Sequence, residues 1–188
     1  MSALTRIRLI ALAAALIALG CSLAIRTLAS AAGGNMAFSI SSNDFQNGGD
    51  IPKKFTCDGV DTSPELSWND PPADTQSLAL ITDDPDAPGG TFMHWVLFNV
   101  PAQTRSLAAN VNKRDELPNG TRQGRNGFGK IGYSGPCPPP GRPHRYYFKL
   151  YALDKKLDLK PGASKAEVEQ AMQGHTLGRA EIMGKYGR

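Results

Sequence analysis

A regular alternation between short apolar segments and turn-forming residues constrains the fold of this chain more than any other feature. From Ala37 onward, apolar stretches are separated by Gly, Pro, Asn and Asp, and the chain of 188 residues contains 20 Gly and 14 Pro. Residues of these types end strands and form tight turns. The segments predicted as strands are Phe38–Ile40, Glu65–Trp68, Ser77–Thr82, Phe92–Val100 and Tyr146–Leu153. The pattern predicts a mainly β, antiparallel domain.

Side chains of a β-strand alternate between its two faces, so each residue of the predicted strand Phe92–Val100 can be assigned to a face. Val96, Phe98 and Val100 are expected on one face, with His94 two residues earlier on the same face. This would place a polar group at the mouth of an apolar face.

The C-terminal end carries helix signals. Ser164 followed by Glu167 is a capping-box pattern, and an apolar stripe follows it. A second short helix is predicted over 177–186, because Ile182 and Tyr186 lie four residues apart. Strands followed by helices favour a two-sheet sandwich with short C-terminal helices at its edge.

The first 34 residues differ in kind from the rest. Arg6 and Arg8 precede an uncharged apolar run from Leu9 to Ile25, and small residues follow from Ala29 to Gly34. This order is typical of a secretory signal. A membrane anchor is the alternative, because about 17 apolar residues can span a bilayer. We therefore expect an export signal and linker at 1–34 and one domain at 35–188.

Two ways of processing this signal stay open. One is cleavage after Ala31 or Ala32. The other treats Ala18-Leu19-Gly20-Cys21 as a lipobox, in which Cys21 becomes the lipidated first residue of a lipoprotein. The expected location is accordingly periplasmic, secreted or anchored to a membrane through an N-terminal lipid.

The net charge of +4 suggests a nucleic-acid partner until the charges are located. Three of the 21 basic residues, Arg6, Arg8 and Arg26, lie in the export segment, and no acidic residue precedes Asp44. That leaves 18 basic residues against 17 acidic ones, scattered along the chain. A stripe of cations that tracks phosphates is not expected, and no nucleic-acid partner is predicted.

Cysteine usage agrees with export. The chain has three cysteines, and Cys21 is either removed or lipidated, which leaves Cys57 and Cys137 as an even pair. An oxidising compartment favours a disulfide between them. Two buried free thiols are the alternative.

A rigid acidic segment, residues 83–90, directly follows the predicted strand Ser77–Thr82. It contains Asp83, Asp84 and Asp86, and its prolines fix the backbone. A solvated acidic turn and a calcium loop both compete with a binding role. The spacing is not that of an EF-hand, and the prolines interrupt a ring of ligands. No metal site is predicted.

A second rigid segment, residues 135–141, is rich in proline and leads into His144 and Tyr146. We interpret it as a stiff loop that presents backbone amides, although recognition by a polyproline-binding groove is an alternative. His144 and Tyr146 share a strand face. An imidazole can be cationic and a phenol can donate a hydrogen bond, so the pair suits a phosphate or a carboxylate.

Other chemistries fit the sequence less well. Two cysteines and two histidines could hold zinc, but no pair has short ligand spacing. The segment Gly132-Tyr133-Ser134-Gly135 is one residue short of the nucleophile elbow of serine hydrolases. No cofactor is predicted.

These segments together resemble the phosphatidylethanolamine-binding protein family, which includes Raf kinase inhibitor protein. The resemblance covers about 38–188. The segments that carry it are 84–88, 94–95, 135–136 and 144–146, and in the bacterial YbhB/YbcL branch also 55–59, 63–68, 137–139 and 184–188. The resemblance implies a two-sheet antiparallel sandwich and a shallow anion pocket. The implied pocket residues are Asp84, Pro88, His94, Gly135, Pro136, His144 and Tyr146, with Asp86 and Trp95 beside them.

We therefore expect a binding module that is not an enzyme. Its ligand would be a small anion such as phosphate or a phosphoethanolamine headgroup, and Asp84 would orient a histidine and raise its pKa. The resemblance further implies a protein partner, a kinase or a protease. A hydrolase that uses a His and Asp pair as acid and base, and an envelope interaction protein with a vestigial pocket, are the rival hypotheses. A monomer or a homodimer is expected.

Overall fold

The computed structural model describes residues 37–188, which form one compact unit. The predicted export signal, its cleavage sites and Cys21 lie outside the described residues. No helix of the described part of the chain is long and apolar enough to cross a membrane.

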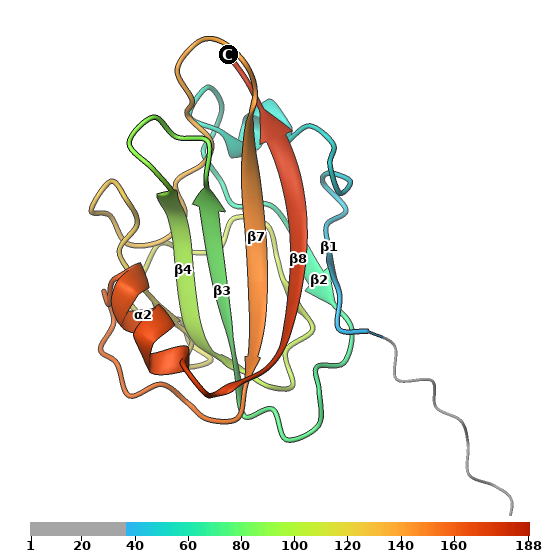
Figure 1. Cartoon of the computed structure of the whole chain (residues 1–188), viewed down its shortest axis with the longest axis vertical. Helices are drawn as coiled ribbons and strands as arrows, with labels where there is room; N and C mark the ends of the chain where they lie inside the picture. The colour runs from blue at the N-terminus through green and yellow to red at the C-terminus, as the bar shows by residue number, and fades with distance from the viewer. Residues whose placement is uncertain (1–36) are drawn as a thin grey trace, which may run out of the picture. The chain divides into compact units, whose positions relative to one another are not determined.

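Two antiparallel sheets build this unit (Figure 1). The larger sheet has the strand order β6-β4-β3-β7-β8, and the smaller has the order β1-β2-β5. The large sheet consists of β3 (Ser77–Asp84), β4 (Phe92–Pro101), β6 (Arg122–Gln123), β7 (His144–Leu153) and β8 (Thr176–Tyr186). The small sheet consists of β1 (Ile40–Ser41), β2 (Leu66–Trp68) and β5 (Ser106–Leu107). The predicted mainly β, two-sheet class is confirmed.

Two apolar clusters cover the two faces of the large sheet. The inner cluster joins it to the small sheet, and its largest fully buried side chains include Trp95, Tyr146 and Phe148. The outer cluster lies under helix α2 (Lys165–Met172), which lies beside β4 in Figure 1 and contributes Val168 and Met172. A single-turn 3-10 helix, η1 (Lys53–Phe55), precedes β2.

The predicted first helix is confirmed. Ser164 is its N-cap, and the reciprocal hydrogen bonds of the capping box with Glu167 are both present. The predicted helix over 177–186 is wrong, because this segment is part of β8 and pairs with β7 along its length. The spacing of four between Ile182 and Tyr186 is even, so it fits one face of a strand as well as one face of a helix.

Two β-bulges in β4 make the predicted assignment of its side chains to a single face wrong. The pairing of β3 with β4 shifts register between Leu78 and Leu80, and Asn99 there has a positive φ of 57°. It shifts again between Thr82 and Asp83, opposite His94. Each shift adds a residue to β4 and changes which face its side chains occupy. Val96 and Phe98 therefore lie in the outer cluster, whereas Val100 lies in the inner one.

Candidate functional site

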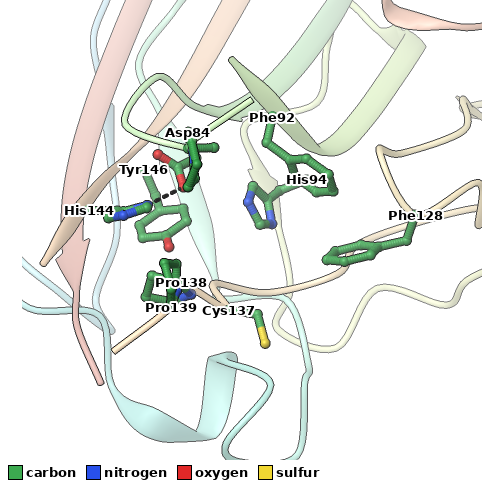
Figure 2. A pocket seen from close by; sticks show the side chains of 11 residues that line it. Asp84, Phe92, His94, Phe128, Cys137, Pro138, Pro139, His144 and Tyr146 are labelled. Atoms are coloured by element: carbon green, nitrogen blue, oxygen red, sulfur yellow. Dashed lines mark hydrogen bonds and ion pairs between the residues drawn. The ribbon is translucent and has the colours of Figure 1, made fainter. Parts of the chain in front are cut away.

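A cavity of about 160 Å³ opens where β3 ends and where β4 and β7 begin (Figure 2). Three strands thus bring together residues that are far apart in the sequence. The residues that line it are Asp84, Ala87, Pro88, Phe92, His94, Phe128, Cys137, Pro138, Pro139, His144 and Tyr146. Five of the predicted site residues are in this set: Asp84, Pro88, His94, His144 and Tyr146.

Asp84 and His144 form a buried pair at one side of the cavity. The Nδ1 atom of His144 donates to Oδ2 of Asp84 over 2.8 Å, and both side chains are less than a tenth exposed. The other carboxylate oxygen of Asp84 accepts the backbone N–H of Asp86 at 2.8 Å. Because Nδ1 of His144 is held in this way, the ring orientation is fixed and Nε2 is left for a ligand.

His94 lies opposite this pair, and the irregularity in β4 explains its position. Its ring packs edge-on against Tyr146 at 5.2 Å between centroids, on the inner face of the sheet. Nδ1 lies 2.7 Å from the backbone oxygen of Ser134. A carbonyl can only accept, so Nδ1 carries a proton and Nε2 is again the free nitrogen.

The electrostatics of His94 differ from our expectation. Burial lowers the pKa of His94 below its ordinary value near 6.5, and it outweighs the Ser134 carbonyl and the charge of Asp84, which act in the opposite direction. Asp84 acts on His94 in the predicted direction, but the predicted net rise of the pKa above its ordinary value is wrong for this residue. His94 is neutral in the free protein at pH 7.

Tyr146 carries the most unusual polar group of the cavity. Its side chain is 1% exposed, and its hydroxyl has no hydrogen-bond partner among the described residues. Burial, followed by the negative charge of Asp84, raises the pKa of Tyr146 well above its ordinary value. The phenol is therefore a protonated donor at any physiological pH, and in Figure 2 it lies between His144 and His94 above Pro138.

Asp86, one of the predicted ligand residues, lies outside the cavity lining. Its carboxylate accepts from Nε and Nη2 of Arg145 at 2.8 and 2.7 Å, and Arg142 lies 3.6 Å away. The hydrogen bond from Arg145 is the main reason that the pKa of Asp86 lies far below its ordinary value. Asp86 therefore fixes the turn after β3 and does not line the cavity.

Three further predicted residues also lie outside the lining. Trp95 is fully buried in the inner cluster, where its indole N–H donates to Gln123. The N–H of Gly135 donates to Oδ1 of Asp61 at 2.6 Å, and the oxygen of Pro136 accepts from Cys57. The expectation that this loop offers its amides to an anion is wrong for these positions, because the Gly135 amide is already bonded and proline has none.

The remaining wall of the cavity is apolar and includes residues that our sequence analysis missed. Phe92 and Phe128 pack edge-on with their centroids 4.7 Å apart, and Pro138 and Pro139 close the opposite side. Phe128 is 50% exposed. Its only sequence signal is a lone aromatic residue between Gly127 and Gly129, which is too weak to assign without a structure.

A disulfide joins Cys57 to Cys137, with 5.4 Å between the Cα atoms, as the even-pair argument predicted. Cys137 lines the cavity, so the bridge ties the proline-rich wall to the loop after η1. In the described part of the chain, no group of three or more His, Cys, Asp or Glu side chains is arranged to hold a metal ion.

The fold and this cavity define a β-sandwich binding protein whose pocket at the strand ends has apolar walls and a few convergent polar groups. The family model described as phosphatidylethanolamine-binding protein matches residues 41–187. The chain therefore belongs to the phosphatidylethanolamine-binding protein family, and the resemblance found in the sequence is confirmed.

Relatives and solved structures agree with this assignment. A UPF0098 protein of Methanothermobacter thermautotrophicus is 54% identical over 144 residues, which cover 77% of this chain and 95% of the relative. The protein YbcL of Escherichia coli is 38% identical over 160 residues, covering 80% of this chain and 87% of YbcL. The crystal structure of YbcL, described as a new member of the mammalian family, matches with a TM-score of 0.75 and 37% identity over 80% of this chain and 98% of that one. A putative family homolog from Chlamydia trachomatis matches with a TM-score of 0.74 and 40% identity, over 81% and 98% of the two chains.

Proposed function

We propose that this protein binds a small anionic group, such as a phosphate or the phosphate of a phospholipid headgroup, in the cavity between His94, His144 and Tyr146. The observation that carries the proposal is the convergence of two buried imidazoles on a buried tyrosine hydroxyl that has no partner among the described residues. An unsatisfied buried hydroxyl costs about 1 to 3 kcal/mol, so a group that accepts its hydrogen bond recovers this cost.

Each polar side chain has a distinct role in this proposal. Tyr146 donates its phenol proton to an anion oxygen. His144, whose Nδ1 is held by Asp84, uses Nε2. His94 enters as a neutral ring and takes up a proton when the anion arrives, because a nearby negative charge favours the imidazolium. Hydrogen bonds to ionised groups are about twice as strong as those between neutral groups.

The name of the family suggests a phospholipid headgroup as the ligand. Asp84 lines the same cavity and supplies a negative charge that could face an ammonium group, so phosphoethanolamine is a natural candidate beside phosphate. We infer binding without turnover, because the groups assembled here position and neutralise a ligand and none of them is set as a nucleophile against a histidine.

The proposal also concerns the location of the protein and its partners. The apolar, acid-free segment 9–25 supports export, and the disulfide between Cys57 and Cys137 supports an oxidising compartment. A lipid on Cys21 would keep the domain at a membrane surface. Inhibition of a kinase or a protease rests on the family resemblance alone.

Calorimetric titration of phosphate and of phosphoethanolamine into residues 35–188 tests the proposal. Replacing His144 by Ala is expected to weaken binding by about 1.5 to 3 kcal/mol, the scale of a charge-assisted hydrogen bond. His175→Ala is the matched control, because His175 is partly exposed, pairs with Asp154 and does not line the cavity. Absence of binding, or equal losses in the two variants, would contradict the proposed function.

A further inference from the structure

A second cavity of about 170 Å³ lies beside the first one. Its lining consists of Cys57, Asp61, Phe128, Lys130, Ser134, Gly135 and Cys137. Phe128 and Cys137 line both cavities, so the two are neighbours that share a wall. In Figure 2 these two residues lie on the side of the pocket away from Asp84 and His144.

The negative charge of this second cavity is already compensated. Oδ1 of Asp61 accepts the Gly135 amide at 2.6 Å, and Oδ2 accepts from Nζ of Lys113 at 3.2 Å. The charge of Asp61 is therefore already paired with the ammonium group of Lys113.

The cation that lines this second cavity has no such partner in the part of the chain that the structure describes. Lys130 lines it, and none of the carboxylates in residues 37–188 lies within 4.0 Å of its ammonium group. The hydroxyl of Ser134 accepts from Nδ2 of Asn126 at 2.9 Å, which leaves its own proton to donate. Asp61 is paired with a cation whereas, among the described residues, Lys130 is not paired with a carboxylate, so the cavity suits an acceptor group, anionic or carbonyl.

Ser134 also connects the two cavities. Its backbone oxygen holds Nδ1 of His94 in the first cavity, while its side chain lines the second. Between them, the half-exposed ring of Phe128 and the disulfide form an apolar partition. A ligand that crosses this partition would need an apolar linker with a polar group at each end.

We propose that the second cavity is a subsite for the far end of the same ligand, and that this ligand is an organic phosphate or phosphonate with a second acceptor group, such as a carboxylate, beyond a short apolar linker. The inference rests on the proposed function, because the first cavity must hold the phosphate end. It assigns to Lys130 a role in selecting the ligand.

Matched synthetic ligands test this subsite. Methylphosphonate probes the first cavity alone, and alkylphosphonates of increasing length add only the linker. Carboxyalkylphosphonates of the same lengths add the acceptor, and aminoalkylphosphonates add a cation in its place. At one linker length, the carboxylate is expected to raise affinity about two- to fivefold over the plain alkyl chain, the scale of an exposed ion pair. The amine is expected to give no such gain.

Lys130→Met should remove the gain from the carboxylate and leave the affinity for methylphosphonate unchanged. Lys156→Met is the matched control, because Lys156 is exposed and lines neither cavity. Equal affinities for the carboxylate and plain chains at every length, a gain with the amine, or equal losses in the two variants would overturn the second subsite. Those results would leave the proposed function in place if methylphosphonate binds. Absence of methylphosphonate binding would contradict the proposed function itself, and the subsite with it.

Discussion

The imidazole of His144 donates to the carboxylate of Asp84 over 2.8 Å, although the two residues are 60 positions apart in the sequence. They come from adjacent strands, β7 and β3, and both side chains are nearly inaccessible. A buried pair of this kind holds a ring in one orientation, and loss of one partner leaves the other without its hydrogen bond.

Asp84→Asn is therefore expected to weaken phosphate binding by about tenfold and to lower the free energy of unfolding by about 1 to 3 kcal/mol. Calorimetry and urea unfolding measure the two effects. Asp86→Asn is the control for charge, because Asp86 pairs with Arg145 outside the cavity. Loss of a negative charge by itself should raise anion affinity, so an affinity that is unchanged or higher in both variants would contradict a role for the pair of Asp84 and His144 in holding the anion.

Because the pKa of His94 is lowered, pH should affect both the free energy of unfolding and the affinity for anions. Well above pH 6.5 the ring is neutral in both the folded and the unfolded chain. As the pH falls below this value, the unfolded chain takes up a proton that the folded chain does not, so the free energy of unfolding decreases. His94→Gln should flatten this decrease.

Anion binding should respond in the opposite direction. Because the anion stabilises the imidazolium, binding draws a proton onto His94, and affinity rises as the pH falls from about 8 to 5. Sulfate is the suitable probe, since its own charge stays constant over this range. Sulfate affinity that is independent of pH would reject the proton uptake by His94.

The structure shows where sequence reasoning is strong and where it fails. The segments with Asp84, His94, His144 and Tyr146 could be found because each lies at the end of an apolar strand next to turn residues. The face of His94 could not be predicted, because one extra residue in β4 reverses the alternation. Phe128 and Lys130 approach the site only through tertiary folding, and no local pattern marks them.

Asn126 is a further test of how the site is held in place. It is 5% exposed, its side-chain N–H groups donate to Gly132 and Ser134, and its oxygen accepts from Phe128 and Lys130. Asn126→Ala should lower the free energy of unfolding by about 2 to 3 kcal/mol and weaken sulfate binding, because the loop whose Ser134 carbonyl holds His94 is loosened. The exposed Asn112→Ala serves as the control. Wild-type stability in Asn126→Ala would contradict this role.

The disulfide should stabilise the domain substantially. It closes a loop with a sequence separation of 80 residues. In the chain-entropy model, its loss through Cys57→Ser with Cys137→Ser costs about 2 to 4 kcal/mol. Denaturant unfolding measures the loss, and thiol titration of the unreduced, denatured protein should detect no free thiol from this pair. Two reactive thiols would show that the bridge does not form.

Replacement of Tyr146 by Phe tests the central claim most directly, because it removes one buried hydroxyl and nothing else. That hydroxyl has no partner among the described residues, so the free protein should be as stable as the wild type or slightly more stable. If the hydroxyl serves the ligand, calorimetric titration at pH 6 should show phosphate affinity reduced by about five- to tenfold, with the free energy of unfolding unchanged or higher. Unchanged affinity in a folded Tyr146→Phe protein would contradict the proposed anion site.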